Sequence, residues 1–501
     1  MSKKKFIFVL FICALSAMIP LLLCTCNDNA AKETADNDDV KQQDSSSPSD
    51  DKQDTFTEDR SKIDDLGDFN FDGYDYKIYN WISPDDFWFD AHLDYEEIEG
   101  EPYHDSVYIR NRAIESRFNI DISITVYEGA GNASIRNLLL SGDATYDLYS
   151  ARGQEAFSFA QEGLIHSINE FEHIDLSKAY WDDFINDQIT IMNKKFFAIG
   201  SFDFASLDYA CVMVVNKQLL QQYGLGNPFE LVKDGKWTFD TFTEMAKVGS
   251  LDIDGDAKFT DKDAWGYVAR SSDVLPGFWV GGAVTASAKD DDDIPQNMMG
   301  TERFFNVIDK IFDMLWGNNI YNTHSSSESV QFDMFINGNV LFNDINFHLL
   351  KKLRGLDTDF GILPYPKLDE AQNGYFTRLG GIAMYFAPKV AAKEDLSRTS
   401  VVLEAMACES LKSCLPAYYD IVLKTKLARD VESEEIIDMV VANRVVDWVD
   451  NMWVVELRDG LLATMFKSKT NTLISLNESK IENIFNNKRD AMVNAFLTLE
   501  N

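Results

Sequence analysis

Positive charge is scarce in this chain. Its 501 residues include 46 lysines and arginines against 82 aspartates and glutamates, so the formal net charge at pH 7 is −36. A surface this negative repels the phosphate backbone of nucleic acids, and no stretch of the sequence gathers basic residues into a stripe. We therefore expect no nucleic-acid partner. Acidity also favours solubility, so it does not identify a function by itself.

Cysteine is scarce as well, and half of the six cysteines lie within the first 26 residues. The other three, Cys211, Cys408 and Cys414, are scattered and match neither a disulfide framework nor a zinc-binding spacing. Cys408 and Cys414 could pair only if the helix expected between them breaks, because a helix holds their Cα atoms too far apart for a disulfide. We expect all three to be buried thiols.

The motifs of common enzyme classes are missing too. The six histidines are scattered, and the sequence contains no H-E-x-x-H, G-x-S-x-G or phosphate-cradling glycine loop. Acidic pairs such as Asp182 with Asp183 could serve as the acid and base of a glycosidase, but a chain this acidic contains such pairs by chance. The sequence therefore predicts a protein that is not an enzyme and that carries no organic cofactor.

What is present begins with an export signal. Lys3, Lys4 and Lys5 form a positive head, and an apolar run continues from Phe6 to Leu23. The run ends at Leu-Cys-Thr-Cys and gives way to a polar stretch at Asn27. This end resembles a bacterial lipobox, so residues 1–26 are predicted to be a lipoprotein signal peptide with Cys26 as the lipidated residue. The alternative is an uncleaved signal anchor, and both interpretations place the body of the protein outside the cytoplasmic membrane.

Two lobes are expected after an acidic tether. Residues 27–66 are rich in Asp, Ser, Lys, Gln and Thr and have almost no large apolar side chain, so this segment cannot bury enough surface to fold and is predicted to be disordered. The full sequence is 45% hydrophobic and 13% aromatic, which suffices for a packed interior in the chain that follows the tether. Its length exceeds that of one ordinary core, which favours two lobes.

Strand and helix patterns alternate along the body. A strand is expected from Phe71 to Trp81, and Ile120, Ile122 and Ile124 alternate in a second. Helical patterns lie between and after these strands, and the buried strand YDLYSA is followed by another helix. Such alternation predicts an α/β fold with a parallel sheet covered by helices. After about Leu396 the sequence is mainly helical.

Five segments, taken in order, carry a resemblance to a known family. They read YDLYSARGQEAFSFAQEGLIHSI, VMVVNKQLLQQYGL, GKWTFDTFTEMAK, FINGNVLF and DFGILPYPKLDEAQ. Each is weak alone, but their order behind a lipobox resembles the extracellular solute-binding proteins of ABC importers, in the large sugar-binding class called family one. The resemblance covers the chain from about Phe71 to Asp420.

This resemblance implies a fold and a set of partners. The expected architecture is a two-lobe periplasmic-binding-protein-like fold with hinge crossing strands and a helical C-terminal part. The N-terminal α/β lobe would span residues 67–215, the C-terminal α/β lobe 216–396, and a helical segment 397–501 would complete both. A ligand bridging the lobes would favour the closed form. The implied partners are a solute, an ABC permease and, through the lipid, the membrane, and the protein is expected to be a monomer.

Candidate ligand residues follow from the chemistry of sugars, whose apolar faces and polar rims call for aromatic platforms beside carboxylate, amide and guanidinium groups. We select residues at strand ends, near glycines or where the family lines its cleft. They are Asn80, Trp81, Arg152, Ser201, Asp203, Trp279, Asn343, Asp344 and Arg378. For each of them a structural role in the core or in a surface ion pair is the competing interpretation.

A calcium loop is predicted between Leu251 and Tyr267, where aspartates alternate. Oxygen ligands at calcium-loop spacing would come from Asp252, Asp254, Asp256, Lys258 (through its carbonyl), Thr260 and Asp263. The spacing resembles dockerin-type loops. Ala257 stands where glycine usually supplies a positive φ, so strain is expected there. The alternative is an acidic turn without a metal.

The sequence thus favours a lipid-anchored extracytoplasmic protein that captures a solute, with a mono- or oligosaccharide as the expected class, and delivers it to an ABC permease. The alternatives are a surface polysaccharide-binding lipoprotein without a transport role and, as the weakest, a secreted glycoside hydrolase. A structural Ca²⁺ is the one cofactor expected.

Overall fold

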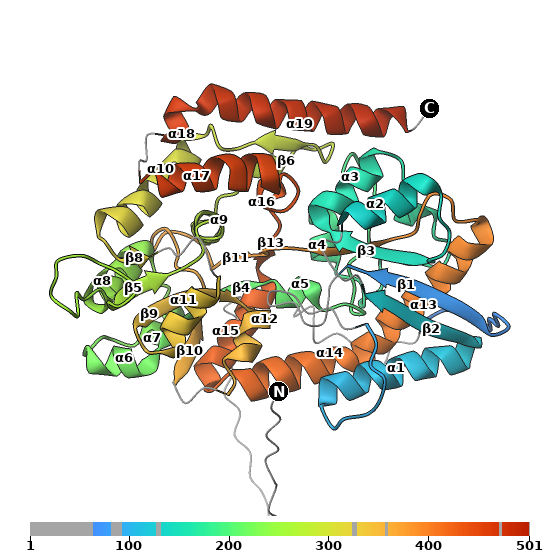
Figure 1. Cartoon of the computed structure of the whole chain (residues 1–501), viewed down its shortest axis with the longest axis horizontal. Helices are drawn as coiled ribbons and strands as arrows, with labels where there is room; N and C mark the ends of the chain where they lie inside the picture. The colour runs from blue at the N-terminus through green and yellow to red at the C-terminus, as the bar shows by residue number, and fades with distance from the viewer. Residues whose placement is uncertain are drawn as a thin grey trace, which may run out of the picture. The chain divides into compact units, whose positions relative to one another are not determined.

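The computed structural model describes residues 64–81, 93–126, 132–322, 328–355, 359–469 and 473–499. The expected signal peptide, the lipidated Cys26 and nearly all of the tether lie outside these ranges. The described chain forms a four-stranded and a five-stranded β-sheet, together with two two-stranded sheets, and helices pack around the two large sheets (Figure 1). This confirms the predicted α/β class.

The first sheet has the strand order β12-β3-β1-β2. Its strands are β1 (Tyr74–Asn80), β2 (Ile120–Val126), β3 (Leu148–Arg152) and β12 (Ala383–Phe386). Strand β1 pairs in parallel with β2 and β3, whereas β12 runs antiparallel to β3. In β2 the buried Ile120 and Ile122 alternate with the exposed Asp121 and Ser123, because one face of the sheet packs on the core and the other meets solvent.

Helices from both ends of the chain cover the first sheet. They are α1 (Pro102–Phe118), α2 (Asn132–Ser141), α3 (Gly153–Gln161) and α13 (Lys393–Lys412). Helix α1 buries Val107, Ile114 and Phe118 at helical spacing and packs on α13. Its Arg110 is also buried, and the guanidinium donates to the carbonyls of Leu93 and Phe202 at 2.8 and 3.1 Å.

The second sheet has the strand order β10-β4-β9-β5-β8. Its strands are β4 (Cys211–Asn216), β5 (Trp265–Val268), β8 (Tyr321–Asn322), β9 (Val340–Asn346) and β10 (Phe360–Leu363). Strand β4 is buried along its whole length and runs antiparallel to both of its neighbours. Its helices are α6 (Lys217–Gln222), α7 (Pro228–Lys233), α8 (Phe239–Gly249), α9 (Val274–Gly281), α10 (Glu302–Phe312), α11 (Glu328–Ile336) and α12 (Phe347–Lys352).

Two details of the sheets differ from the sequence predictions. Neither sheet is purely parallel, because the chain passes from one sheet to the other and back, and β4 and β12 then enter their new sheet antiparallel to a neighbour. The expected lobe boundaries also shift. Strand β4 belongs to the second sheet and β12 to the first, so the first lobe does not run to residue 215, nor does the second run to 396.

Two crossing segments lie side by side between the sheets. One leads into β4 and the other follows β11 (Thr377–Arg378) on the way to β12. Ala210 forms an isolated antiparallel bridge with Leu379, and the Gly380 amide donates to the Tyr209 carbonyl at 2.9 Å. Strand β11 also pairs in parallel with β13 (Arg444–Val445). Segments distant in the sequence therefore meet where the two lobes join.

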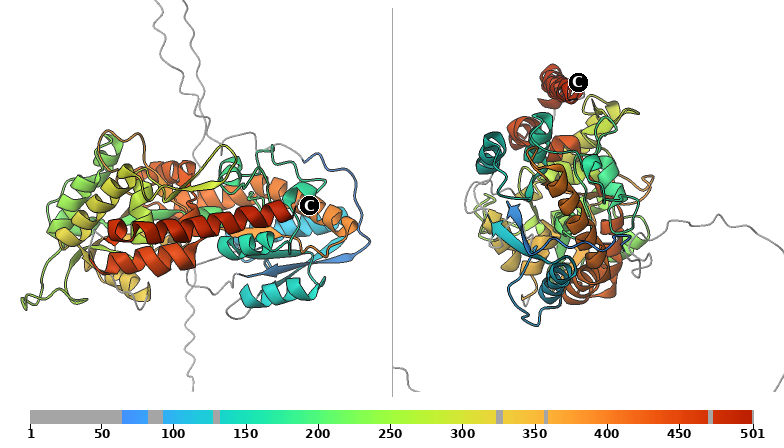
Figure 2. Two further views of the ribbon diagram at one scale, coloured as in Figure 1. Left: turned by 90° about the horizontal axis from the view of Figure 1, so that it is seen from above. Right: turned by 90° about the vertical axis from the view of Figure 1, so that its right-hand side faces the viewer.

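The C-terminal part is helical, as predicted. After α13 come α14 (Cys414–Pro416), the π-helical η3 (Ala417–Leu427), α15 (Val431–Ala442), α16 (Trp448–Asn451), the π-helical η4 (Val454–Leu462), α17 (Ala463–Lys467), α18 (Leu473–Leu476) and α19 (Glu478–Thr498). Helix α19 contacts α3 of the first lobe as well as β7 (Pro295–Asn297) and η4 (Figure 2). In it Phe485 packs against Trp453 and Phe496 stacks on Phe196, with ring centroids 4.8 and 4.9 Å apart. The last helix thus ties both lobes together.

Candidate functional site

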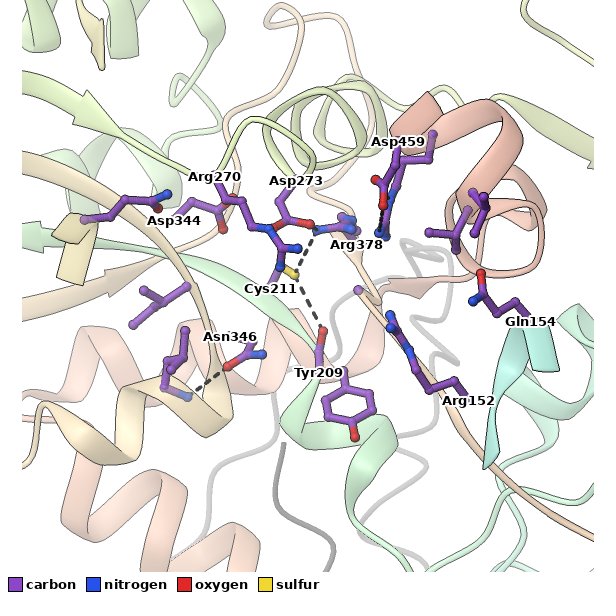
Figure 3. Close-up of a pocket in the computed structure, with 17 residues that line it drawn as sticks. Arg152, Gln154, Tyr209, Cys211, Arg270, Asp273, Asp344, Asn346, Arg378 and Asp459 are labelled. Carbon is purple, nitrogen blue, oxygen red and sulfur yellow. Dashed lines mark hydrogen bonds and ion pairs between the residues drawn. The ribbon is translucent and has the colours of Figure 1, made fainter. Parts of the chain in front are cut away.

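A cavity of about 350 Å³ opens where the two sheets meet (Figure 3). Its wall on the first lobe is the end of β3 with Arg152 and the start of α3 with Gln154. Its wall on the second lobe is the segment after β5 and the end of β9. Tyr209 and Gly380 of the crossing segments and part of η4 complete it. Because β3, β5 and β9 all end here, the cavity occupies the position where α/β sheets bind ligands.

The lining is strongly polar. Among the described residues that form it are four arginines and three aspartates, and Tyr209 is the only aromatic side chain. The charged residues are Arg152, Arg270, Arg378, Arg458, Asp273, Asp344 and Asp459. Most described tryptophans are instead buried in the core. The described part of the lining therefore offers more hydrogen-bonding and charged groups than aromatic platforms of the kind expected for a sugar.

A buried ion-pair cluster underlies one side of the cavity. Arg378, only 2% exposed, donates from Nε and Nη2 to the two carboxylate oxygens of Asp450 at 2.7 and 2.9 Å. Its Nη1 lies 3.0 Å from Oδ1 of Asp273. Arg458 donates to the same Asp450 at 3.2 Å. These four residues, the Arg378 cluster, link β11, the loop before α9, α16 and η4.

The cluster fixes the charge state of Asp273. Burial alone would raise the pKa of this carboxyl, but the guanidiniums of Arg378, Arg270 and Arg458 outweigh it and lower the pKa to about 2. Asp273 is thus ionised at any physiological pH. Its carboxylate already interacts with arginines of the protein, so it is less able to bind a cationic or hydrogen-bonding group of a ligand.

Asp344 behaves in the opposite way. It lies near the end of β9, and burial raises the pKa of its carboxyl to about 7, although the nearby Tyr365 hydroxyl works against the rise. Asp273 raises this pKa further and Arg378 lowers it. Near neutral pH a large fraction of Asp344 is therefore protonated, and the carboxyl can donate a hydrogen bond to a ligand oxygen.

Two arginines reach the cavity from opposite lobes. Arg152 comes from the end of β3 and Arg270 from the segment after β5, and both guanidiniums point toward the middle of the cavity (Figure 3). The Arg152 guanidinium lies 6.0 Å from the ring centroid of Trp81. Nε of Arg270 lies 3.7 Å from a carboxylate oxygen of Asp273, a long and half-exposed ion pair. Neither belongs to the Arg378 cluster.

Three of the nine predicted ligand residues line the cavity: Arg152, Asp344 and Arg378. Trp81 lies beside them, against Arg152. Asn343, the neighbour of Asp344 in β9, is 1% exposed because successive strand residues point to opposite faces. Whether these residues bind a solute stays a prediction.

The other candidates lie in the core or in turns and are not part of this lining. Trp279 is fully buried in α9, an apolar helix enclosed on all sides, where it packs against Phe304. Asn80 is buried and accepts a hydrogen bond from the Ser150 hydroxyl at 2.7 Å.

Ser201 and Asp203 serve a turn after residue 200. The Ser201 amide donates to the Tyr180 carbonyl at 2.8 Å. The Asp203 carboxylate accepts from the Ala205 amide at 3.1 Å. Burial raises the pKa of Asp203 to about 7. The carboxyl thus stabilises the start of α5 (Ala205–Asp208) instead of facing the described cavity.

Several lining residues were missed from the sequence. Arg270 and Asp273 follow β5 in the way that Arg152 follows β3, so the strand-end rule could have found them. Gln331 of α11 is 5% exposed, lines the cavity, and its amide nitrogen has no hydrogen-bond partner among the described residues. Arg458 and Asp459 lie in η4, where no sequence signal marks them.

The predicted calcium ligands lie elsewhere, in a loop closed by reciprocal backbone hydrogen bonds of 3.0 Å between Leu251 and Ala264. Carboxylate oxygens of Asp252, Asp254 and Asp256 lie within 4.8 Å of one another, a grouping that could hold a cation. We call residues 251–264 the Asp252 loop. Ala257 has a φ of +60°, the left-handed conformation that its place in a calcium loop demands.

Asp263 is used differently. It is fully buried, and its two oxygens accept from the amides of Ile253 at 3.0 Å and Thr260 at 2.6 Å. These backbone hydrogen bonds lower the pKa of its carboxyl. Asp263 therefore braces the loop from within and is not grouped with the other three carboxylates. Calcium at this loop stays a prediction.

The thiols confirm the cysteine prediction. Cys211, Cys408 and Cys414 are buried, and none of them is in a disulfide within the described ranges. No helix among the described residues has both the length and the apolar stretch needed to cross a membrane.

No protein-family model matches the sequence, and no curated protein matches it either. Solved structures do match. A cyclo/maltodextrin-binding protein in complex with maltotetraose has a TM-score of 0.57 and 14% identity, covering 84% of this chain and 98% of that one.

Two further structures extend the likeness. An ABC substrate-binding protein of Listeria monocytogenes in complex with cycloalternan has a TM-score of 0.52 and 11% identity, covering 86% of this chain and all of that one. UgpB of Mycobacterium tuberculosis in complex with glycerophosphocholine has a TM-score of 0.51 and 14% identity, covering 80% and 98%. The fold is that of the ABC substrate-binding proteins. At these identities the likeness shows the fold alone.

Proposed function

We propose that this protein is a lipid-anchored, extracytoplasmic solute-binding protein that captures a saccharide between its two lobes and delivers it to an ABC permease. One observation carries the proposal. A polar cavity lies between two α/β lobes, at the strand ends, in a chain whose fold is shared with substrate-binding proteins in complex with sugars.

The cavity walls suit capture by closure. Arg152 belongs to one lobe, Arg270 and Asp344 to the other. A solute that hydrogen-bonds to both walls at once favours the closed arrangement, because the open one offers it only one wall. The paired crossing segments at Tyr209 and Gly380 lie where such a motion would bend the chain.

Anchoring and localisation rest on the sequence. The lipobox-like end of the leader supports lipidation at Cys26, and the polar tether behind it would let the body move near a permease. We expect a monomer without an organic cofactor.

Two alternatives are distinguished by what happens to the solute. A surface protein that only holds polysaccharide would bind it without supporting uptake. A glycoside hydrolase would cleave it.

The test is thermal unfolding of the purified protein against a panel of mono- and oligosaccharides, with glycerophosphodiesters and short peptides as comparison classes. A saccharide that binds the native state raises Tm by mass action. Uptake of the same saccharide should be lost when the gene is deleted, and the saccharide should be recovered intact after incubation with the protein. Stabilisation only by a non-saccharide, or cleavage of the saccharide, would contradict the proposal.

A further inference from the structure

The turn from β9 into α12 holds one side chain of the cavity in a fixed orientation. Asn346 ends β9, and its Oδ1 accepts a hydrogen bond from the Leu349 amide at 2.8 Å, which caps the start of α12. Because the oxygen is held in this way, Nδ2 lies on the other branch of the same planar amide and faces the cavity (Figure 3). Asn346 therefore offers a solute its donor, while its acceptor is already used.

Asp344 lies on the same face of β9 as Asn346. Side chains alternate along a strand, so residues two apart point the same way, at a spacing of about 6.6 Å. Both residues are half-buried and line the cavity, and Ile345 between them is buried. The carboxyl of Asp344 keeps an acceptor oxygen whether or not it is protonated. This wall of the cavity thus presents an acceptor and a donor side by side.

Gln331 adds a second donor on the same lobe. It stands on α11, which packs on β9, and it lines the cavity with only 5% of its surface exposed. Its Nε2 is buried and has no hydrogen-bond partner in the described part of the chain. A buried amide without a partner is rare in folded proteins and costs free energy. A solute oxygen bound to Nε2 would remove this cost.

An acetamido group fits the pair on β9 by its shape and by its hydrogen bonds. Its carbonyl accepts while its N–H donates in the opposite direction, and with a hydrogen bond of about 2.9 Å at each end it spans a length close to that between two such strand residues. Its methyl group needs an apolar neighbour. Leu349 lines the cavity, and the capping hydrogen bond holds it beside Asn346. A hydroxyl in the same place is smaller and could reach only one of the two side chains.

We propose that the saccharide captured in this cavity carries an acetamido group, whose carbonyl is bound by Nδ2 of Asn346 and whose N–H is bound by the carboxyl of Asp344; this rests on the proposed function. Gln331 then binds another oxygen of the saccharide. Tyr209 is the one aromatic residue of the described lining, so stacking on sugar rings contributes less to binding and a ring substituent contributes more. The solute class is an N-acetylated amino sugar or a short oligosaccharide that contains one.

The experiment is isothermal titration calorimetry of the purified protein with pairs of saccharides that differ only in the acetamido group. The pairs are N-acetylglucosamine with glucose, N-acetylgalactosamine with galactose, and N,N′-diacetylchitobiose with cellobiose. At least one acetamido member should bind more tightly than its hydroxyl counterpart by about 10-fold or more, because the counterpart lacks a hydrogen bond and the methyl contact.

Asn346→Asp tests the assigned donor, because it retains an oxygen to cap α12 and replaces the N–H group with a second oxygen. It should bring the two members of the pair within about 3-fold of each other. Asn227→Asp is the matched control. It makes the same change at the exposed residue that caps α7, outside the described cavity lining, and should leave the ratio unchanged.

Two further residues sharpen the test. Asp344→Leu should lose the preference for the acetamido member, whereas Asp344→Asn keeps an acceptor oxygen and should preserve it. Gln331→Met should weaken both members of a pair alike, by about 3-fold or more, because it removes a hydrogen bond to an oxygen that both contain. Thermal unfolding of each variant reports its stability. A loss of fold weakens both members equally, whereas a lost acetamido contact changes their ratio.

The outcomes separate the two proposals. If the hydroxyl member of every pair binds as tightly as its acetamido counterpart, the acetamido assignment is wrong while the proposed function stands. A preference that survives Asn346→Asp would overturn the assignment too. If no member of any pair binds, the acetamido assignment is wrong, and the wider panel of saccharides decides the proposed function by itself.

Discussion

Two groups of charged side chains in this protein, those of the cavity and those of the Asp252 loop, are built in different ways. The cavity and the Arg378 cluster beneath it draw on β3, β5, β9, β11 and η4, elements that lie up to three hundred residues apart. The Asp252 loop draws all of its carboxylates from one short stretch of chain.

The difference lies in how each place handles its charge. In the Arg378 cluster, guanidiniums and carboxylates are buried together and neutralise one another. In the loop, Asp252, Asp254 and Asp256 repel one another in solvent, and backbone amides are the groups that satisfy them, such as that of Gly255 at 2.7 Å from Asp252. In the first arrangement each buried charge depends on its partners, so removing one of them is costly, whereas the second is tolerated because water screens it.

The largest effect is expected from breaking the buried cluster. Arg378→Met removes the cation that Asp450 and Asp273 share and leaves two carboxylates without it in a low-dielectric site. The free energy of unfolding should fall by about 3–5 kcal/mol, measured by urea denaturation. The matched control is Arg136→Met on α2, whose ion pair with Glu162 is at the surface and should leave the midpoint unchanged. Equal effects of the two substitutions would contradict the distinction between buried and exposed charge.

A smaller effect is expected from the pH dependence of stability. Asp344 has its pKa raised to about 7 by burial, so between the ordinary pKa of a carboxyl and 7 the folded state binds more protons than the unfolded one. Stability should therefore fall as pH rises from 5 to 8. Asp344→Asn should raise the free energy of unfolding more at pH 8 than at pH 5, with a difference between the two of about 1–2 kcal/mol.

The slope will not vanish in this variant. Asp203 and Asp447 also have pKa values raised to about 7 by burial and remain in place. The charged or titratable groups that interact electrostatically with Asp344 in the described structure are Tyr365, Tyr267, Cys211, Asp273 and Arg378. None of them is expected to titrate between pH 5 and 8. An unaltered slope in Asp344→Asn would therefore show that its carboxyl is ionised throughout.

The smallest effect is expected at the Asp252 loop. If calcium binds there, a concentration a few-fold above Kd should stabilise the protein by about 1 kcal/mol, seen as a rise in Tm that a chelator reverses. Asp252→Asn combined with Asp254→Asn should abolish the rise. Asp291→Asn combined with Asp292→Asn removes two exposed carboxylates from another acidic run and should preserve it. No rise in the unsubstituted protein would make the loop an acidic turn without a metal.

The two places also differ in how far the sequence predicts them. The loop is local, so the spacing of three aspartates and the strain at Ala257 were enough to foresee the grouping and the positive φ. The spacing could not show that the backbone amides of Ile253 and Thr260 donate hydrogen bonds to the Asp263 carboxylate, because this depends on the path of the chain.

The cavity is assembled from distant segments, and prediction was less complete there. A strand end pointed to Arg152, and the same reasoning applied to β5 would have added Arg270. Asp344 was selected as a weaker candidate without that reasoning. Reasoning from strand ends could not find Arg458, because nothing in a helical sequence pattern indicates that this side chain lies toward β11. Trp279 was predicted to contact the ligand because a tryptophan among glycines suits a ligand platform and a close-packed helix equally well. In the structure it belongs to α9, a helix that is buried on all sides.

The α/β class and the helical end followed from periodicity, whereas the antiparallel strands did not. The direction of β4 and β12 depends on the chain crossing between sheets. Periodicity reports which face of a strand is buried and carries no information on the direction of its neighbour.

Hydrogen–deuterium exchange with and without a saturating saccharide tests whether the saccharide binds between the two lobes. If it does, exchange should slow on both walls of the cavity and at the joint between the lobes, in residues 148–158, 340–352 and 376–382. Helix α1, none of whose residues lines the cavity, should exchange unchanged. Protection confined to one lobe, or centred on α1, would contradict the account.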